Sequence, residues 1–140
     1  MDAIQVIKRD HRAVEDLYAE YQGSHDESKK ELLAKEIFDS LDNHAKMKET
    51  FFYPALSEEG DEEEAMVREA QAEHNDMKSL IARARDTEGE ELDSLLSELM
   101  ETVLGHVKEE EEELLPDAER RLGARKLTAL GEEMEPHSAV

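Results

Sequence analysis

HVKEEEEELLP, residues 106–116, places a histidine and a carboxylate on the apolar side of a predicted helix. His106 and Glu110 are four residues apart, so they share one helix face. That face also carries an apolar stripe, formed by Leu92, Leu95, Leu99, Val103 and Leu114. The pattern therefore predicts a helix whose buried side is interrupted by two polar groups.

A second stretch, HAKMKETFFYP at residues 44–54, has the same shape, with a histidine first and a proline ten positions later. His11 and His74 also fall within apolar series at helical spacing. The predicted helices cover residues 3–21, 28–54, 61–86, 87–115 and 117–134. Amphipathic helices joined by short turns predict an all-α, up-down-up-down four-helix bundle with a short additional C-terminal helix.

Turn and cap residues set the expected helix ends. Asp2, with Gln5 three residues on, is expected to cap the first helix. Asp61 is expected to cap the third, and Thr87 with Glu90 forms a capping-box pattern before the fourth. Pro54 is expected to bend or end the second helix.

Length and composition indicate one domain over residues 1–140, with residues 135–140 as a loose tail. The chain has no cysteine, which excludes disulfides and thiolate sites. The formal net charge of −21 argues against nucleic acid and anionic membranes as partners, and we interpret it as solvation of the outer helix faces. No signal-peptide region or membrane-length apolar run stands out, so we expect a cytoplasmic protein.

Four of the six histidines are expected to meet inside the bundle. His25 falls in a turn and His137 in the tail, but the other four come one per helix, at heights that agree within one or two turns: His11, His44, His74 and His106. A single core histidine is ordinarily satisfied by hydrogen bonds. Four buried imidazoles with few polar partners would be costly to desolvate, and a metal removes that cost.

Imidazole with carboxylate suits iron, manganese or zinc, and a carboxylate can bridge two ions. Glu110 is the best carboxylate, because in the acidic run only Glu110 shares the inward face with His106. Glu109 could reach partway, and Glu111–Glu113 are expected to face water or the helix flank. The residues alone therefore predict a dinuclear metal site.

Nearly the whole chain resembles the hemerythrin family, in its HHE cation-binding branch. The landmarks are Asp10-His11, His44 with the FFYP ending, Glu73-His74 and HVKEEEEELLP. The resemblance implies two iron ions with a bridging oxygen species, held in a helical bundle that binds dioxygen or related molecules. It implies metal ligands at five positions: His11, His44, His74, His106 and Glu110.

Two positions depart from the family pattern. Lys48 stands where the family usually has a glutamate, and Lys78 stands where classical members have a second histidine. The missing carboxylate is expected from Glu49, which would need a π-bulge to point inward, from Glu15 or from Glu73. Lys48 is expected to turn its ammonium to solvent, and its alternative role is a donor beside the ligands or a change in metal affinity. Tyr18 is a further candidate beside the ligands, although packing is its simpler role.

These observations favour a di-iron protein that acts on dioxygen, peroxide or nitric oxide. Catalase-like peroxide disproportionation is one reaction open to it, and whether the chain is an enzyme stays open. Two alternatives are binding without turnover, as in iron buffering or oxygen and iron sensing, and a structural bundle that has lost its metal. The sequence identifies no protein partner.

Overall fold

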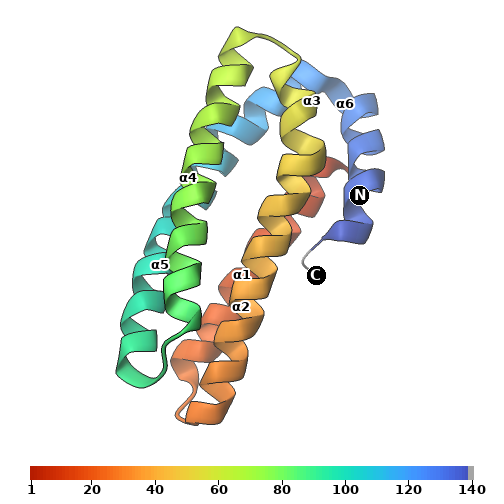
Figure 1. The fold of residues 1–140 in the computed structure, drawn as a ribbon. Helices are drawn as coiled ribbons and strands as arrows, with labels where there is room; N and C mark the ends of the chain where they lie inside the picture. The colour runs from red at the N-terminus through yellow and green to blue at the C-terminus, as the bar shows by residue number, and fades with distance from the viewer. Residues whose placement is uncertain (139–140) are drawn as a thin grey trace.

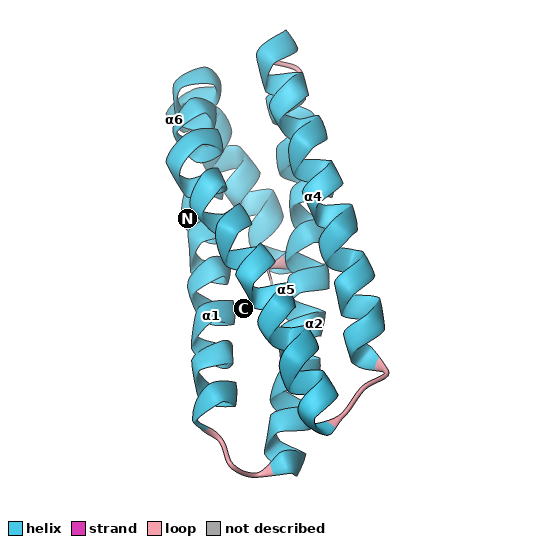
Figure 2. Cartoon of the chain, turned by 90° about the vertical axis from the view of Figure 1, so that its left-hand side faces the viewer, coloured by secondary structure: helices cyan, strands magenta, loops and turns pink. Residues whose placement is uncertain are grey.

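The computed structural model describes residues 1–138, and these residues form an all-helical bundle. Its long helices are α1 (Ala3–Gly23), α2 (Glu27–Met47), α4 (Asp61–Arg85), α5 (Gly89–Glu109) and α6 (Leu115–Met134). Short turns join α1 to α2 and α4 to α5, and the members of each pair pack against each other (Figure 1). Figure 2 shows helix throughout, with loops only at the turns and the C-terminal end, and no strand.

Two helical rods change their pitch in the middle. The π-helical segment η1 (Lys48–Phe52) carries α2 into α3 (Tyr53–Ser57), and η2 (Glu110–Leu114) carries α5 into α6. In both segments a backbone N–H bonds the carbonyl five residues earlier, from Tyr53 to Lys48 and from Leu115 to Glu110. Each π-segment comes just before a proline, whose missing N–H interrupts ordinary helical bonding. Pro54 therefore does not end the helix, which continues to Ser57.

The expected caps are only partly right. Asp2 and Gln5 form the predicted capping box at α1. Asp61 is instead the first residue of α4, and Gly60 occupies its N-cap without a side-chain bond. The capping box at Thr87 was also wrong, because α5 begins at Gly89 and the Thr87 hydroxyl donates to the carbonyl of Ala84. At the start of α5, Gly89 has a φ of 64°, a left-handed conformation that favours glycine, so the chain turns there without the predicted polar cap.

The C-terminal part of the chain folds back along the bundle. Gly123 has a φ of 78°, so α6 bends there, and its later turns pack against α1. Residues 135–138, expected to be loose, form the 3-10 turn η3 (Glu135–His137) and then a contact in which the Ser138 hydroxyl donates to Asp10. The rest of the predicted tail, residues 139–140, lies outside the described residues.

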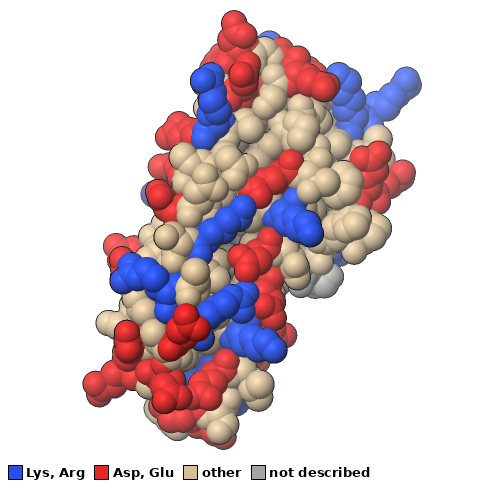
Figure 3. Space-filling model, viewed as in Figure 1, with Lys and Arg blue, Asp and Glu red and all other residues tan. Residues whose placement is uncertain are grey.

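The hydrophobic core has two parts. One surrounds Ile7, Phe52 and Leu115, and the other surrounds Ile37, Leu96 and Leu99. Figure 3 shows acidic and basic side chains interspersed over one face of the molecule, with uncharged residues between them. Among the described residues only four carboxylates are buried, namely Asp10, Glu63, Glu110 and Asp117. No helix in the described part of the chain is long and apolar enough to cross a membrane.

Candidate metal centre

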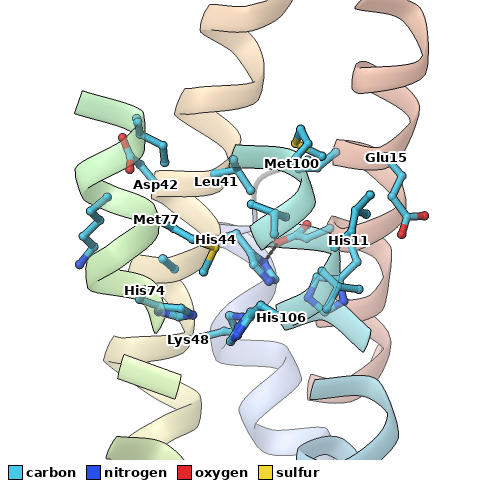
Figure 4. Close-up of a pocket in the computed structure, with 18 residues that line it drawn as sticks. His11, Glu15, Leu41, Asp42, His44, Lys48, His74, Met77, Met100 and His106 are labelled. Carbon is cyan, nitrogen blue, oxygen red and sulfur yellow. Dashed lines mark hydrogen bonds and ion pairs between the residues drawn. The ribbon is translucent and has the colours of Figure 1, made fainter. Parts of the chain in front are cut away.

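Four buried histidines come together inside the bundle, one from each of α1, α2, α4 and α5. Figure 4 shows their rings pointing toward a common region. The rings of His11 and His44 lie 5.0 Å apart, and those of His74 and His106 lie 5.1 Å apart. The structure therefore brings these four side chains together, as the sequence predicted.

Glu110 lies between the two histidine pairs. Its Oε1 is 3.4 Å from the Nε2 of His11, and its Oε2 is 3.1 Å from the Nε2 of His106. Two groups of potential ligand atoms result, His11–His44–Glu110 and His74–His106–Glu110, and the three atoms of each group lie within 4.8 Å of one another. Glu110 is 2% exposed, so the carboxylate that joins the two groups is shielded from bulk water.

Outer carboxylates hold the other ring nitrogen of three histidines. The Nδ1 atom of His11 lies 2.6 Å from Glu111, that of His44 lies 2.8 Å from Asp10, and that of His106 lies 2.5 Å from Glu73. An ionised carboxylate only accepts hydrogen bonds, so each of these Nδ1 atoms carries the ring proton. The Nε2 atom of each ring is then left as a bare lone pair, directed inward.

The inward Nε2 atoms of His11, His44 and His106 are buried and have no hydrogen-bond partner. Two of them nevertheless face an oxygen of Glu110 at 3.1–3.4 Å. Lone pairs from nitrogen and carboxylate at that distance repel each other unless a proton or a metal ion lies between them. Donors bound side by side to one metal at about 2.1 Å are themselves about 3 Å apart, which matches this spacing.

Lys48 corrects one of our expectations. Its side chain is 1% exposed and turns inward, where Nζ lies 3.0 and 3.1 Å from the two oxygens of Glu110. The expected solvent-facing ammonium is therefore wrong, because the buried carboxylate of Glu110 gives the ammonium a partner inside the bundle.

Tyr53 completes the inner network, and the sequence did not mark it as a site residue. Its hydroxyl donates to Glu110 Oε2 at 3.0 Å and lies 3.2 Å from His74 Nε2. Burial, followed by the nearby charge of Glu110, raises the pKa of Tyr53 well above its usual range. The phenol therefore stays protonated. Its place directly before Pro54, in the FFYP stretch, was the available signal in the sequence.

Electrostatics keep two of the rings neutral. Burial, and then the Lys48 ammonium, lowers the pKa of His44 to about 4. The same two causes, followed by His106, lower the pKa of His74 to about 2. Burial alone would raise the pKa of Glu110, but Lys48 holds it well below its usual range. At neutral pH the centre thus contains the Glu110 carboxylate and the neutral imidazoles of His44 and His74, and these are the forms that ligate metals.

The remaining candidates lie outside this inner group. Glu49 is in the predicted π-segment, but it bonds Gln71 and Lys78 and reaches only the outer Nδ1 of His74, at 3.5 Å. Glu73 bonds the outer nitrogen of His106, and Glu15 pairs with Arg12. Tyr18 stacks on Tyr21, with ring centroids 6.3 Å apart.

Two carboxylates near the sequence candidates proved more important than expected. Glu111, expected to face water or the helix flank, instead reaches back to His11 while also pairing with Arg12. Asp10 precedes His11 in sequence but serves His44 on the neighbouring helix. Residues adjacent in sequence thus serve different rings, which spacing within one helix could not reveal.

A small cavity adjoins the histidines on one side. Its volume is about 40 Å³, and Figure 4 shows residues that line it. Besides the four histidines and Lys48, the walls are mainly apolar, with Val14, Leu41, Met77, Ile81, Met100 and Val103 among them. The volume suits a molecule of two or three heavy atoms.

A third group of carboxylates lies nearer the surface, formed by Glu69, Glu73 and Glu109. It borders a second hollow that is also lined by His106 and Glu110. Glu69 and Glu109 are exposed, so this group differs from the buried centre in its access to water.

The comparisons with known proteins agree with this geometry at the level of the family. The model of the hemerythrin HHE cation-binding domain matches residues 2–118. No curated protein and no solved structure matches the chain.

Proposed function

This chain belongs to the hemerythrin HHE cation-binding domain family, and from that premise we propose that it is an iron protein that handles a small oxygen or nitrogen species. The candidate ligands in this proposal are His11 and His44 with Glu110, and the second candidate group adds His74 and His106 around the same carboxylate. The observation that carries it is the set of three buried, unpartnered Nε2 atoms around one carboxylate. Imidazole with carboxylate suits iron, manganese and zinc, and the family resemblance favours iron among them.

The residues fit a metal ion by a test independent of the family. Leaving a buried ring nitrogen unpartnered costs free energy, and three such atoms share one site. A cation bound to the Nε2 atoms of His11 and His44 and to Glu110 would remove part of that cost. The carboxylates on the Nδ1 atoms would then orient the rings and make them stronger ligands.

Iron, when bound, supplies one-electron redox chemistry toward a small ligand, and the chain's own residues shape what reaches it. The apolar walls of the 40 Å³ cavity favour a small neutral molecule over an ion or an organic substrate. This supports dioxygen, hydrogen peroxide or nitric oxide as the ligand. Lys48 is among the residues that line the cavity, and the N–H groups of its ammonium could donate to such a ligand.

Two finer features belong to the same proposal. The helices would follow the up-down-up-down order of a four-helix bundle, with α6 added at the C-terminal end. The second feature is the number of ions: two irons with a bridging oxygen species, as the family resemblance implies, would need three donors from each group with Glu110 serving both, whereas the contacts of Lys48 and Tyr53 with Glu110 favour a single ion.

A loading experiment tests the proposal. Metal-free protein would be loaded anaerobically with ferrous iron, freed of unbound metal, and then exposed separately to dioxygen, peroxide and nitric oxide while its absorption spectrum is recorded. We expect bound iron and a new absorption band with at least one of the three, and peroxide consumption would separate an enzyme from a binding protein. Zinc-loaded protein is the control, since zinc has no redox chemistry. A folded chain that retains no iron would contradict the proposal.

A further inference from the structure

The ammonium of Lys48 places a positive charge among the candidate metal ligands. Its Nζ contacts both oxygens of Glu110, the one carboxylate shared by the two candidate groups. Its charge also acts on His44 and on His74, which belong to different groups. The ammonium therefore lies near both positions that a pair of metal ions would take.

The two groups are not equally ready to bind. In the first group, His11 and His44 both have Nδ1 held by a carboxylate at 2.6–2.8 Å, and both Nε2 atoms lack a partner. Both rings therefore already present the lone pair that a metal needs.

In the second group, the hydroxyl of Tyr53 occupies the ring nitrogen of His74 that would bind a metal. Its single proton goes to Glu110, so its oxygen can only accept from His74, whose Nε2 lies 3.2 Å away. The outer Nδ1 of His74 is 3.5 Å from Glu49, too far to fix the opposite tautomer firmly. The proton of His74 thus lies on Nε2, and only His106 offers a bare ring nitrogen there.

We propose, building on the metal-binding function above, that this chain binds a single metal ion in its interior, at His11, His44 and Glu110, with the Lys48 ammonium standing in for the second cation. Lys48 contacts both oxygens of Glu110, but only Oε2 also accepts from Tyr53, so Oε1, which turns toward His11, is the less occupied of the two. A second divalent ion would have to displace the Tyr53 contact and bind beside a fixed positive charge.

The test counts ions in the intact chain. Metal-free protein would be titrated anaerobically with ferrous iron and, in parallel, with manganese(II), with excess magnesium present to occupy surface carboxylates. Bound metal would be measured by elemental analysis and by the electron paramagnetic resonance of manganese. The count would be repeated in the variant Glu69→Gln/Glu109→Gln, which lacks two carboxylates of the surface group, so that ions bound there are not counted as interior ions.

We expect one ion per chain in the wild type and in that surface variant. His44→Gln should reduce the count to near zero, whereas the matched change His74→Gln should leave it at one. Two interior ions in the wild type, or loss with His74→Gln but not with His44→Gln, would overturn this inference. No bound ion at all would overturn the proposed metal-binding function itself, so the two failures are distinguishable.

Substitution of Lys48 tests its part directly. Lys48→Glu should raise the count to two, because it removes the charge and supplies a second carboxylate. Lys48→Met removes only the charge, so we expect one ion, bound at least tenfold more tightly than in the wild type. A count that stays at one in Lys48→Glu, with the helical circular dichroism unchanged, would overturn the assignment to Lys48. The wild-type count needs no variant, so it tests the inference whatever a substitution does to folding.

Discussion

The contact between Lys48 and Glu110 makes a sharp prediction for the metal-free chain. Lys48→Met should destabilise the protein strongly, because it leaves the Glu110 carboxylate buried with Tyr53 as its remaining strong donor. Loss of one partner of a buried ion pair typically costs about 3–5 kcal/mol.

The distances set the scale of this effect. With Nζ and Oε1 3.0 Å apart, the attraction at an effective dielectric constant of about 20 is about 5 to 6 kcal/mol. Desolvation of both charges offsets much of this in the intact pair. Removing both charges together should therefore cost less than removing one. The double variant Lys48→Met/Glu110→Gln should lose less free energy of unfolding than the sum of the losses in the two single variants, by at least about 2 kcal/mol.

Urea unfolding of metal-free protein, followed by circular dichroism, measures all four free energies of unfolding. The matched control is Lys35→Met, an exposed lysine on α2, the helix that leads into η1, and this change should alter stability by less than about 0.5 kcal/mol. A Lys48→Met variant within about 1 kcal/mol of the wild type, with no coupling to Glu110→Gln, would refute the buried ion pair.

Other measurements test the rest of the site. Burial and Lys48 lower the pKa of His44 to about 4, so the unfolded chain binds this proton before the folded chain does as the pH falls below about 6.5. The metal-free protein should therefore be fully stable above that pH and lose roughly 3 kcal/mol of its free energy of unfolding by pH 4, as measured by urea unfolding at a series of pH values. The loss should be smaller in His44→Gln. Asp10→Asn should weaken metal binding about 10- to 100-fold in competition with a chelator, since Asp10 orients His44, and unchanged affinity would speak against that role. Tyr53→Phe should cost about 1.5–3 kcal/mol in metal-free unfolding, because Glu110 loses a buried donor, and a neutral result would place that hydroxyl elsewhere. Removing metal from loaded protein should lower the melting temperature in calorimetry by roughly 10 °C if the ion was present at about 100 times its dissociation constant, and an unchanged melting temperature would exclude a bound interior ion.

Periodicity was sufficient to place the histidines. Each of the four sits among apolar residues at helical spacing, so burying those residues also buries the rings. Glu110 was found in the same way, from its position one helical turn after His106. The family resemblance added iron and the oxygen chemistry, which helix geometry alone does not contain.

Other features depend on contacts between helices. Whether Lys48 turns inward is decided by the carboxylate of Glu110 on another rod, and intrinsic preference favours a solvated ammonium. The sequence pointed to a π-bulge through Glu49, but the π-segment directs Lys48 to the centre and Glu49 to its edge. Partners such as Asp10 and Glu111 could not be assigned to a ring before the relative heights of the helices were known.

Anomalous diffraction from crystals of the iron-loaded protein tests the central claim most directly, because it locates the ion itself. We predict one interior peak, within bonding distance of the Nε2 atoms of His11 and His44 and of Glu110 Oε1. Iron found only on surface carboxylates such as Glu69 and Glu109, with the four histidines unligated, would contradict it.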